Sequence, residues 1–205
     1  REFDSPFGAS GANTSYALLM QAHMALYGCK PEDYAQIAAG SRANAQLNPN
    51  AIFYGSPATV EDVLASPMIA SPLHLLEIVM PVAGGDAVIV TTAKKALKGP
   101  HRPVWLEGAG EKITHRIVSQ APCLTSGPLK PAIARALQQS GQAVNKIDFL
   151  SLYDCYTIMV ATTIEDAGLC KPGQFGNWLR DNGGMGPGSC QPINTYGGQL
   201  GFGQP

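Results

Sequence analysis

Two short stretches of this chain hold the side chains best suited to chemistry. Tyr153, Asp154 and Cys155 follow an apolar run, and a glycine-rich stretch near the end closes on Gln204 and Pro205. The phenolic hydroxyl of Tyr153 and the amide of Gln204 are both competent hydrogen-bond donors. Glycine lacks Cβ, so a glycine-rich backbone can approach a ligand closely. The two stretches therefore predict a ligand site that offers neutral donors.

The composition limits the partners of the chain. Hydrophobic residues make up 45% and charged residues 14% of the 205 positions, whereas about 25% charged residues is usual in soluble domains. A surface with so little charge is expected to be covered, either by partner subunits of an oligomer or by the missing half of a larger protein. The net charge is −1, and no basic run indicates nucleic-acid binding. The longest apolar stretches, such as residues 75–82, are too short to span a membrane.

The cysteines do not form a metal-binding pattern. The five cysteines are widely spaced and include no Cys-x-x-Cys pair, so no metal site is expected. We interpret them as buried, reduced thiols of a cytoplasmic protein. They are Cys29, Cys123, Cys155, Cys170 and Cys190.

Helices must position these residues, and several carry clear boundary signals. Thr59 and Asp62 have the spacing of an N-cap and its acidic partner, and Gly28 and Gly141 are plausible helix-ending glycines. A glycine-rich stretch over 173–191 is expected to be a loop. The expected helices cover 14–27, 31–44, 59–65, 92–97, 128–141 and 157–169.

Apolar, β-branched runs alternate with the later helices. We expect strands over 84–91, 103–108 and 148–153, and this alternation predicts an α/β sheet with crossover connections. Function in such sheets lies where strands end, which here means Tyr153 to Cys155. Asp154 is equally typical of an N-cap for the helix that starts near Thr157.

The order of these features resembles the thiolase family, most closely the sterol-carrier-protein-x and lipid-transfer-protein thiolases. Their pattern reads His-Asp-Cys-Phe at the strand end and Asn-x-x-Gly-Gly-x-x-x-x-Gly-His-Pro in the loop. The upstream order, including the Asn48-Pro49 break, agrees as well. The stretches that carry the resemblance are 16–27, 62–68, 85–88, 128–140, 147–157, 165–170, 194–198 and 203–205.

The resemblance implies a thiolase-like fold with α/β/α/β/α layers. It divides the chain into a mostly helical, substrate-covering loop domain (1–80), the last strand and helix of the N-terminal half (81–102) and the first part of the C-terminal half (103–205). By this map both catalytic cysteines lie outside the chain, upstream of Arg1 and beyond Pro205. The chain is therefore expected to be a fragment lacking the family's N-terminal start and C-terminal end, and Cys123, Cys155 and Cys190 do not replace those cysteines.

Two positions depart from the family pattern, because Tyr153 and Gln204 stand where thiolases have histidines. Those positions help to form the oxyanion hole that polarises the thioester carbonyl. Tyr and Gln can still donate hydrogen bonds, but Gln204 cannot move a proton near neutral pH. The departures favour retro-aldol cleavage of a bulky β-hydroxyacyl-CoA, as in thiolase-like steroid side-chain aldolases. Tyr153 could act as an acid, or as a base if its neighbours lowered its pKa.

The resemblance also implies binding residues. Asp154 is a candidate catalytic residue beside Tyr153 and Gln204. Ser126 and Gly127 open a helix whose N–H groups could meet coenzyme A, although ordinary capping is the alternative. Four loop residues complete the candidate set: Asn194, Gly197, Gly198 and Phe202. For the two glycines and Asn194, shaping the loop is the alternative role.

Two other functions compete with the lyase. One is an acetyl-CoA acyltransferase with an altered oxyanion hole, and the other is a catalytically silent thiolase-like subunit of a complex. In each case no tightly bound cofactor is expected, and coenzyme A enters as part of the substrate. The resemblance further implies a homodimer and a small OB-fold partner subunit.

Overall fold

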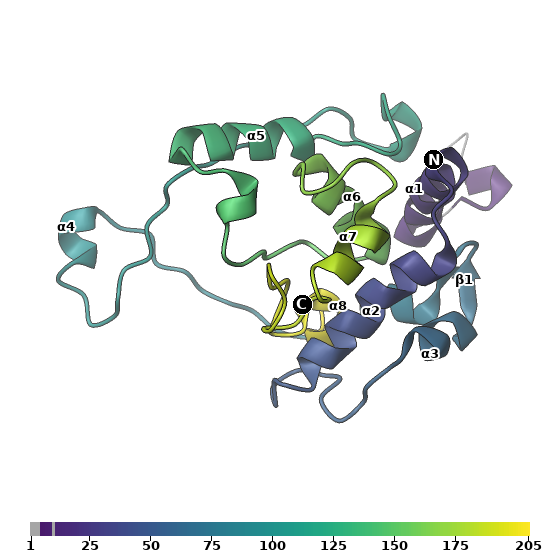
Figure 1. The fold of residues 1–205 in the computed structure, drawn as a ribbon, viewed down its shortest axis with the longest axis horizontal. Coiled ribbons are helices and arrows are strands. Elements are labelled where there is room, and N and C mark those ends of the chain that lie inside the picture. The colour runs from purple at the N-terminus through teal and green to yellow at the C-terminus, as the bar shows by residue number, and fades with distance from the viewer. Residues whose placement is uncertain (1–4, 10) are drawn as a thin grey trace.

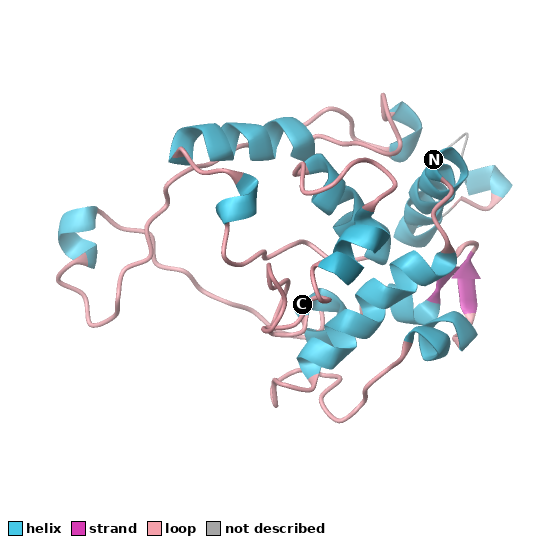
Figure 2. Cartoon of the chain, in the orientation of Figure 1, coloured by secondary structure: helices cyan, strands magenta, loops and turns pink. Residues whose placement is uncertain are grey.

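The computed structural model describes residues 5–9 and 11–205. Helices dominate the described residues, and the only sheet among them is the antiparallel pair β1 (Met68–Ala70) and β2 (Leu73–His74) (Figures 1 and 2). The α-helices are α1 (Gly11–Tyr27), α2 (Pro31–Ala45), α3 (Val60–Ala65), α4 (Ala93–Ala96), α5 (Leu129–Ser140), α6 (Thr157–Asp166), α7 (Phe175–Asp181) and α8 (Gly198–Phe202). Single 3-10 turns are η1 (Ser5–Phe7), η2 (Leu75–Glu77), η3 (Val118–Gln120) and η4 (Val144–Lys146).

Local capping explains where several helices begin and end. The Thr59 hydroxyl accepts from the Asp62 N–H at 3.1 Å, and the Asp62 carboxylate accepts from the Thr59 N–H at 2.9 Å. This reciprocal pair satisfies two backbone donors that the first turn of α3 cannot use. Gly141 ends α5 in the left-handed conformation, with φ of 68°. The helices expected from the sequence are confirmed, with boundaries shifted by a few residues.

Helix α2 forms the centre of the packed body. It lies against α6, α7 and α8, and Tyr34 and Ile37 on it are fully buried. Gly40 allows close packing, because a Cβ there would meet the Met185 sulfur at 2.8 Å. The side chain of Asn44 donates to the carbonyl oxygens of Ile193 and Asn194 at 2.9 and 3.1 Å. Helix α2 thus holds the start of the C-terminal loop in place.

A buried polar network ties α1, α2 and α6 together. The His23 ring contacts the Tyr34 hydroxyl at 2.8 Å and the Glu165 carboxylate at 2.9 Å. The other carboxylate oxygen of Glu165 accepts from the N–H groups of Gly173 and Phe175. The polar side chains of this network therefore all have hydrogen-bond partners, as their burial requires.

The loop expected over 173–191 is wrong in part, because α7 forms inside it. Phe175 and Leu179 are buried and lie on one face of that helix. Their spacing of four residues is a helical signal, which the many surrounding glycines obscure. Gln174 precedes the helix, and Glu165 accepts from the Phe175 N–H at 3.3 Å.

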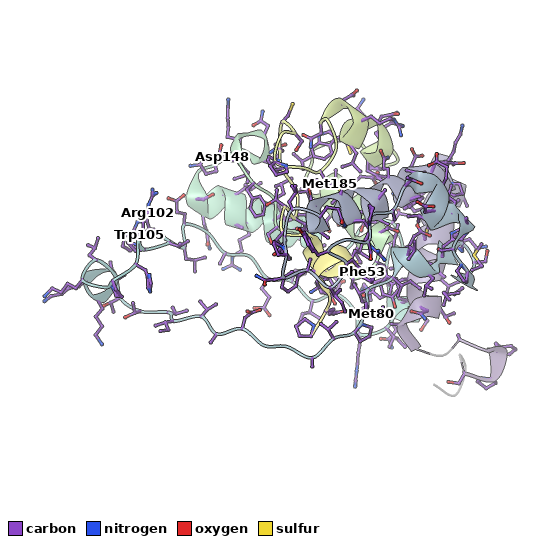
Figure 3. The ribbon with its side chains drawn as sticks, turned by 90° about the horizontal axis from the view of Figure 1, so that it is seen from below. Phe53, Met80, Arg102, Trp105, Asp148 and Met185 are labelled. Atoms are coloured by element: carbon purple, nitrogen blue, oxygen red, sulfur yellow. The ribbon has the colours of Figure 1, made fainter. Side chains whose placement is uncertain are left out.

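The strands expected over 84–91 and 103–108 are extended but unpaired among the described residues. They form the two limbs of a long excursion that carries α4 at its tip (Figure 1). Figure 3 shows Arg102 and Trp105 on the return limb, away from the packed body. Val88, Ile89 and Val90 are 86%, 90% and 91% exposed. A strand needs a neighbour about 4.8 Å away, and these limbs diverge.

The third expected strand, over 148–153, is also not a strand among the described residues. It makes a single bridge between Leu150 and Ile193. The crossover sheet expected within the chain is therefore wrong, whereas the division into three regions stays a prediction.

Candidate functional site

Tyr153 and Gln204 meet in space. The side-chain amide of Gln204 donates to the Tyr153 phenolic oxygen at 3.2 Å (Nε2 to Oη). Tyr153 is 51% exposed, so the pair lies at the surface, where a ligand can reach it. The Tyr153 hydroxyl also forms a hydrogen bond with the Cys155 thiol, so a ligand acceptor would compete with that sulfur for the phenolic hydrogen.

Two backbone arrangements position this pair. Gln204 is fixed beside the segment after η2, since its N–H donates to the Met80 carbonyl at 3.0 Å and its own carbonyl accepts from the Val82 N–H at 2.8 Å. Figure 3 shows Met80 close to the C-terminal segment. On the other side, the Asn194 side chain accepts from the Leu152 N–H at 2.8 Å and donates to the Leu152 carbonyl at 2.9 Å. Asn194 therefore clamps the residue that precedes Tyr153, a loop-shaping role.

Asp154 is fully buried and holds the first turn of α8. Its carboxylate accepts from the N–H groups of Gln199 and Leu200 at 2.7 and 3.2 Å. Burial raises the pKa of Asp154, and these two hydrogen bonds oppose the rise. The alternative that Asp154 caps the helix starting at Thr157 is wrong, because Tyr156 is the N-cap of α6 and no side chain caps it.

The two loop glycines permit this arrangement. Gly198 has φ of 62°, and a Cβ there would overlap the Asp154 carboxylate. Gly197 has φ of 117°, and a Cβ would approach Ala45 of α2 at 3.3 Å. Both glycines pack the loop against buried groups, and their geometry supports loop shaping.

Tyr16 of α1 is a neighbour of Tyr153 that the sequence did not single out. Its ring stacks on Tyr156 with ring centres 4.0 Å apart. Burial, followed by the hydrogen bond with Cys155, raises the pKa of Tyr16. Partial burial and the neighbouring Cys155 also raise the pKa of Tyr153, while the bond from Gln204 opposes the rise. Both phenols are therefore protonated at neutral pH, and of the two roles expected for Tyr153 the structure favours the acid.

A cavity of about 550 Å³ lies beside Tyr16, and we call it the α1–α6 cavity. Tyr16 and Leu19 of α1 and Met159 of α6 form part of its largely apolar wall. Three basic side chains also line it, namely Lys112, His115 and Arg116.

Ser126 and Gly127 line this same cavity, but their donors are already used. The Ser126 hydroxyl donates to Asp166 at 2.6 Å, and the Gly127 N–H donates to the other carboxylate oxygen at 2.9 Å. The capping alternative is wrong for α5, because its N-cap is Pro128 and no side chain caps it; Asp166 of α6 holds the two residues instead. They can still form part of the wall.

A second cavity of about 550 Å³ lies next to Gln204, and we call it the α8 cavity. It is lined by residues 82–86 and by residues of the C-terminal loop, including Phe202 and Gln199. The rings of Phe202 and Tyr196 meet edge to face with centres 6.0 Å apart. Gln199 follows the Gly197-Gly198 pair directly, which is the only signal in the sequence that could have identified it.

The cysteines are all unpaired thiols in the described residues. Cys29 and Cys155 are buried, but Cys123 and Cys190 are exposed, so the expectation of buried thiols is wrong for these two. Hydrogen bonds from Thr125 lower the pKa of Cys123.

No helix among the described residues is long and apolar enough to cross a membrane.

Comparison with known proteins supports the resemblance. Residues 110–205 match the family model "Thiolase C-terminal domain-like". The chain is 34% identical over 204 residues to the 17-hydroxy-3-oxo-4-pregnene-20-carboxyl-CoA lyase of Mycobacterium tuberculosis, covering 97% of this chain and 53% of that one. It is 33% identical to the steroid side-chain-cleaving aldolase of Thermomonospora curvata, and the match covers 96% of this chain and 51% of that one. The chain thus spans about half the length of these curated relatives.

Solved structures give the same result. The Ltp2-ChsH2(DUF35) aldolase superposes with a TM-score of 0.92 at 30% identity, over 98% of this chain and 54% of that one. A monomeric SCP2-thiolase-like protein from Mycobacterium smegmatis has a TM-score of 0.66 at 20% identity, and the match covers 96% of this chain and 43% of that one. The likeness confirms the thiolase-like fold expected for the chain.

Proposed function

Because the chain belongs to the thiolase superfamily, we propose that it is part of an enzyme that cleaves a carbon–carbon bond in a bulky β-hydroxyacyl-CoA. The named activities of its relatives, a carboxyl-CoA lyase and a steroid side-chain-cleaving aldolase, point to this reaction class. The hydrogen bond between Gln204 and Tyr153 is the observation that carries the proposal.

The pair supplies what a retro-aldol cleavage needs at the thioester. A base removes the proton of the β-hydroxyl, the Cα–Cβ bond breaks, and its electrons form an enolate on the CoA fragment. The enolate is then protonated at Cα, so the reaction consumes no net proton. Tyr153 is protonated and can donate to the thioester oxygen as charge develops there. One such donor is typically worth about 10²–10³ in rate.

The α1–α6 cavity fits the coenzyme A portion of the substrate. Its wall is mostly apolar, and Lys112, His115 and Arg116 line it beside Tyr16. The cationic side chains of Lys112 and Arg116 complement the phosphates of coenzyme A, and an apolar wall complements its pantetheine chain. Tyr16 joins this cavity to Tyr153 through their shared contact with Cys155.

An acyltransferase is the second candidate, because acetyl-CoA acetyltransferases are also similar to the chain, at 29% identity for the one from Methanothermobacter thermautotrophicus. Neither Tyr153 nor Gln204 titrates near neutral pH. A condensation that relies on an imidazole at those positions would be impaired, which favours the lyase.

A partner subunit belongs to the proposal as well. The solved aldolase is named for two components, Ltp2 and ChsH2(DUF35), and this chain carries few charges and two extended, unpaired limbs. We propose a small OB-fold partner, a homodimeric assembly and a cytoplasmic location.

The test is turnover of a polycyclic β-hydroxyacyl-CoA by the protein in complex with its OB-fold subunit. We expect release of a ketone together with the shortened acyl-CoA. Formation of a new thioester from acetyl-CoA, without ketone release, would favour the acyltransferase. Absence of turnover with and without the partner would leave the chain as a silent subunit.

A further inference from the structure

Glu77 is a fully buried carboxylate that takes no part in the reaction described above. It is the last residue of η2. Its Oε2 accepts from the His74 backbone N–H at 2.9 Å and lies 3.1 Å from Nδ1 of the His74 ring. Its Oε1 accepts from the Thr157 hydroxyl at 3.1 Å, across 80 positions of the chain. Burying a carboxylate is costly even when partners compensate it, so this link between two distant elements requires an explanation.

The distant partner of this carboxylate belongs to the stretch that carries Tyr153. Thr157 is the first residue of α6, and its side chain is fully buried. Tyr153 lies only four positions earlier in the chain. The contact between Thr157 and Glu77 therefore fixes the end of η2 against one side of the site.

The residues that follow this carboxylate, 78–82, connect the two sides of the site, and we call them the bridging segment. The Val79 N–H donates to the Cys155 carbonyl at 3.2 Å, and the Met80 carbonyl accepts from the Gln204 N–H at 3.0 Å. Adjacent residues have Cα atoms about 3.8 Å apart. The backbones of Cys155 and Gln204 are thus held by two neighbouring residues of one segment, which limits how far they can separate.

The position of the bridging segment consequently affects the bond between Gln204 and Tyr153. That bond joins two side chains at 3.2 Å, and hydrogen bonds weaken steeply with poor geometry. A displacement of about 1 Å in a group that acts on the substrate can cost about 10²-fold in rate. A buried anchor at the start of the bridging segment therefore has a functional consequence at the surface.

We propose that Glu77 is a positioning residue for the Tyr153–Gln204 pair. By accepting from Thr157 it fixes the bridging segment, and with it Gln204, against the stretch that carries Tyr153. This inference rests on the proposed function, because it concerns the same pair of donors. Glu77 contacts neither the substrate nor a transferred proton, and it acts only through the backbone contacts of the bridging segment.

The phenolic carbon of Tyr153 reports on the pair without any turnover. In the complex with carbon-13 at Cζ of its tyrosines, the Tyr153 signal is identified by its loss in Tyr153→Phe. Gln204→Ala removes the donated hydrogen bond and should move this signal. Thr157→Val keeps the shape of the threonine but removes the donor to Glu77, and it should move the signal in the same direction. With Gln204→Ala already present, Thr157→Val should add no further change, because the two act through one contact.

The kinetics should show the same dependence. Thr157→Val is expected to lower kcat about tenfold and to change KM by less than about twofold. With Gln204→Ala present, the loss caused by Thr157→Val should shrink to less than about twofold. Thr163→Val is the matched control and should leave kcat and KM unchanged. Thr163 is also a buried threonine of α6, but its hydroxyl donates within the helix, to the Met159 carbonyl at 2.6 Å.

A stronger variant removes both carboxylate oxygens. Glu77→Met should lower kcat more than Thr157→Val does, again with little added effect beside Gln204→Ala, and the threonine variant remains informative if the methionine variant fails to fold. An unmoved Tyr153 signal in Thr157→Val, or equal losses of kcat with and without Gln204→Ala, would overturn the inference. If the signal moves as expected but no acyl-CoA is cleaved, the positioning role stands and the proposed lyase falls.

Discussion

The Gln204 amide donates to the Tyr153 hydroxyl at 3.2 Å, although the two residues lie 51 positions apart. The contact depends on two anchors: Asn194 holds the backbone before Tyr153, and Met80 accepts from the Gln204 N–H. One neutral donor thus supports another at an exposed point of the surface. This arrangement is suited to polarising a carbonyl without a titrating group.

Replacing Tyr153 by Phe removes the donor but keeps the ring. We expect kcat for the acyl-CoA to fall about 10²–10³-fold, because the lost hydrogen bond is strongest when charge develops on the thioester oxygen. KM should change by less than about threefold. Steady-state kinetics measure both. Tyr54→Phe, at another half-exposed tyrosine, is the matched control, and equal losses in kcat and affinity would indicate a structural tyrosine.

The pH profile distinguishes a neutral donor pair from an imidazole. The pKa of Tyr153 is raised above its ordinary value, so the phenol keeps its proton at neutral pH and loses it only as the pH rises beyond about 10. We expect these two residues to impose no inflection on kcat between about pH 6 and 9. Gln204→His should introduce an inflection in kcat at about pH 6.5. An unchanged profile for Gln204→His would show that position 204 does not contact the reacting groups.

Gly198→Ala tests the fixation of α8 by Asp154. A methyl group at Gly198 would overlap the Asp154 carboxylate, whereas Gly55 has a similar positive φ of 78° and open space around it. Gly55→Ala should cost about 1–2 kcal/mol from backbone strain alone. Gly198→Ala should cost about 3 kcal/mol or more, because overpacking is added. Urea unfolding gives both values, and equal losses would mean that the contact with Asp154 does not matter for stability.

Charge reversal in the α1–α6 cavity tests where coenzyme A binds. The double variant Lys112→Glu, Arg116→Glu should raise KM for the acyl-CoA about tenfold at low salt, and the effect should shrink as salt screens the charges. The pair Lys94→Glu, Lys95→Glu on the exposed α4 changes the net charge equally and should leave KM unchanged. A similar rise in both variants would reveal a general charge effect in place of a binding site.

The sequence predicted the helices well because their signals are local. Thr59 with Asp62, and Gly141, mark boundaries through residues a few positions away. Strand pairing is not local, so the apolar run at 84–91 correctly indicated extended backbone and could not reveal whether a partner strand lies within the chain. The same reason explains the error at Asp154, whose hydrogen-bond partners lie 45 and 46 positions away.

The site was predictable only where a pattern connected distant positions. The family pattern linked Tyr153 with Gln204, and the two side chains meet. Nothing in the sequence linked Tyr16 to them, because a tyrosine on an apolar helix is usually a core residue. The basic lining of the α1–α6 cavity was likewise hidden, since Lys112 and Arg116 lie in an extended stretch without a motif.

The most direct test is the infrared carbonyl stretch of an isotope-labelled acyl-CoA thioester bound to the complex. If the Tyr153–Gln204 pair polarises the thioester, the band should shift to lower frequency on binding, and Tyr153→Phe should reverse most of that shift. A bound carbonyl that absorbs as it does in water, or a shift that persists in Tyr153→Phe, would contradict the account.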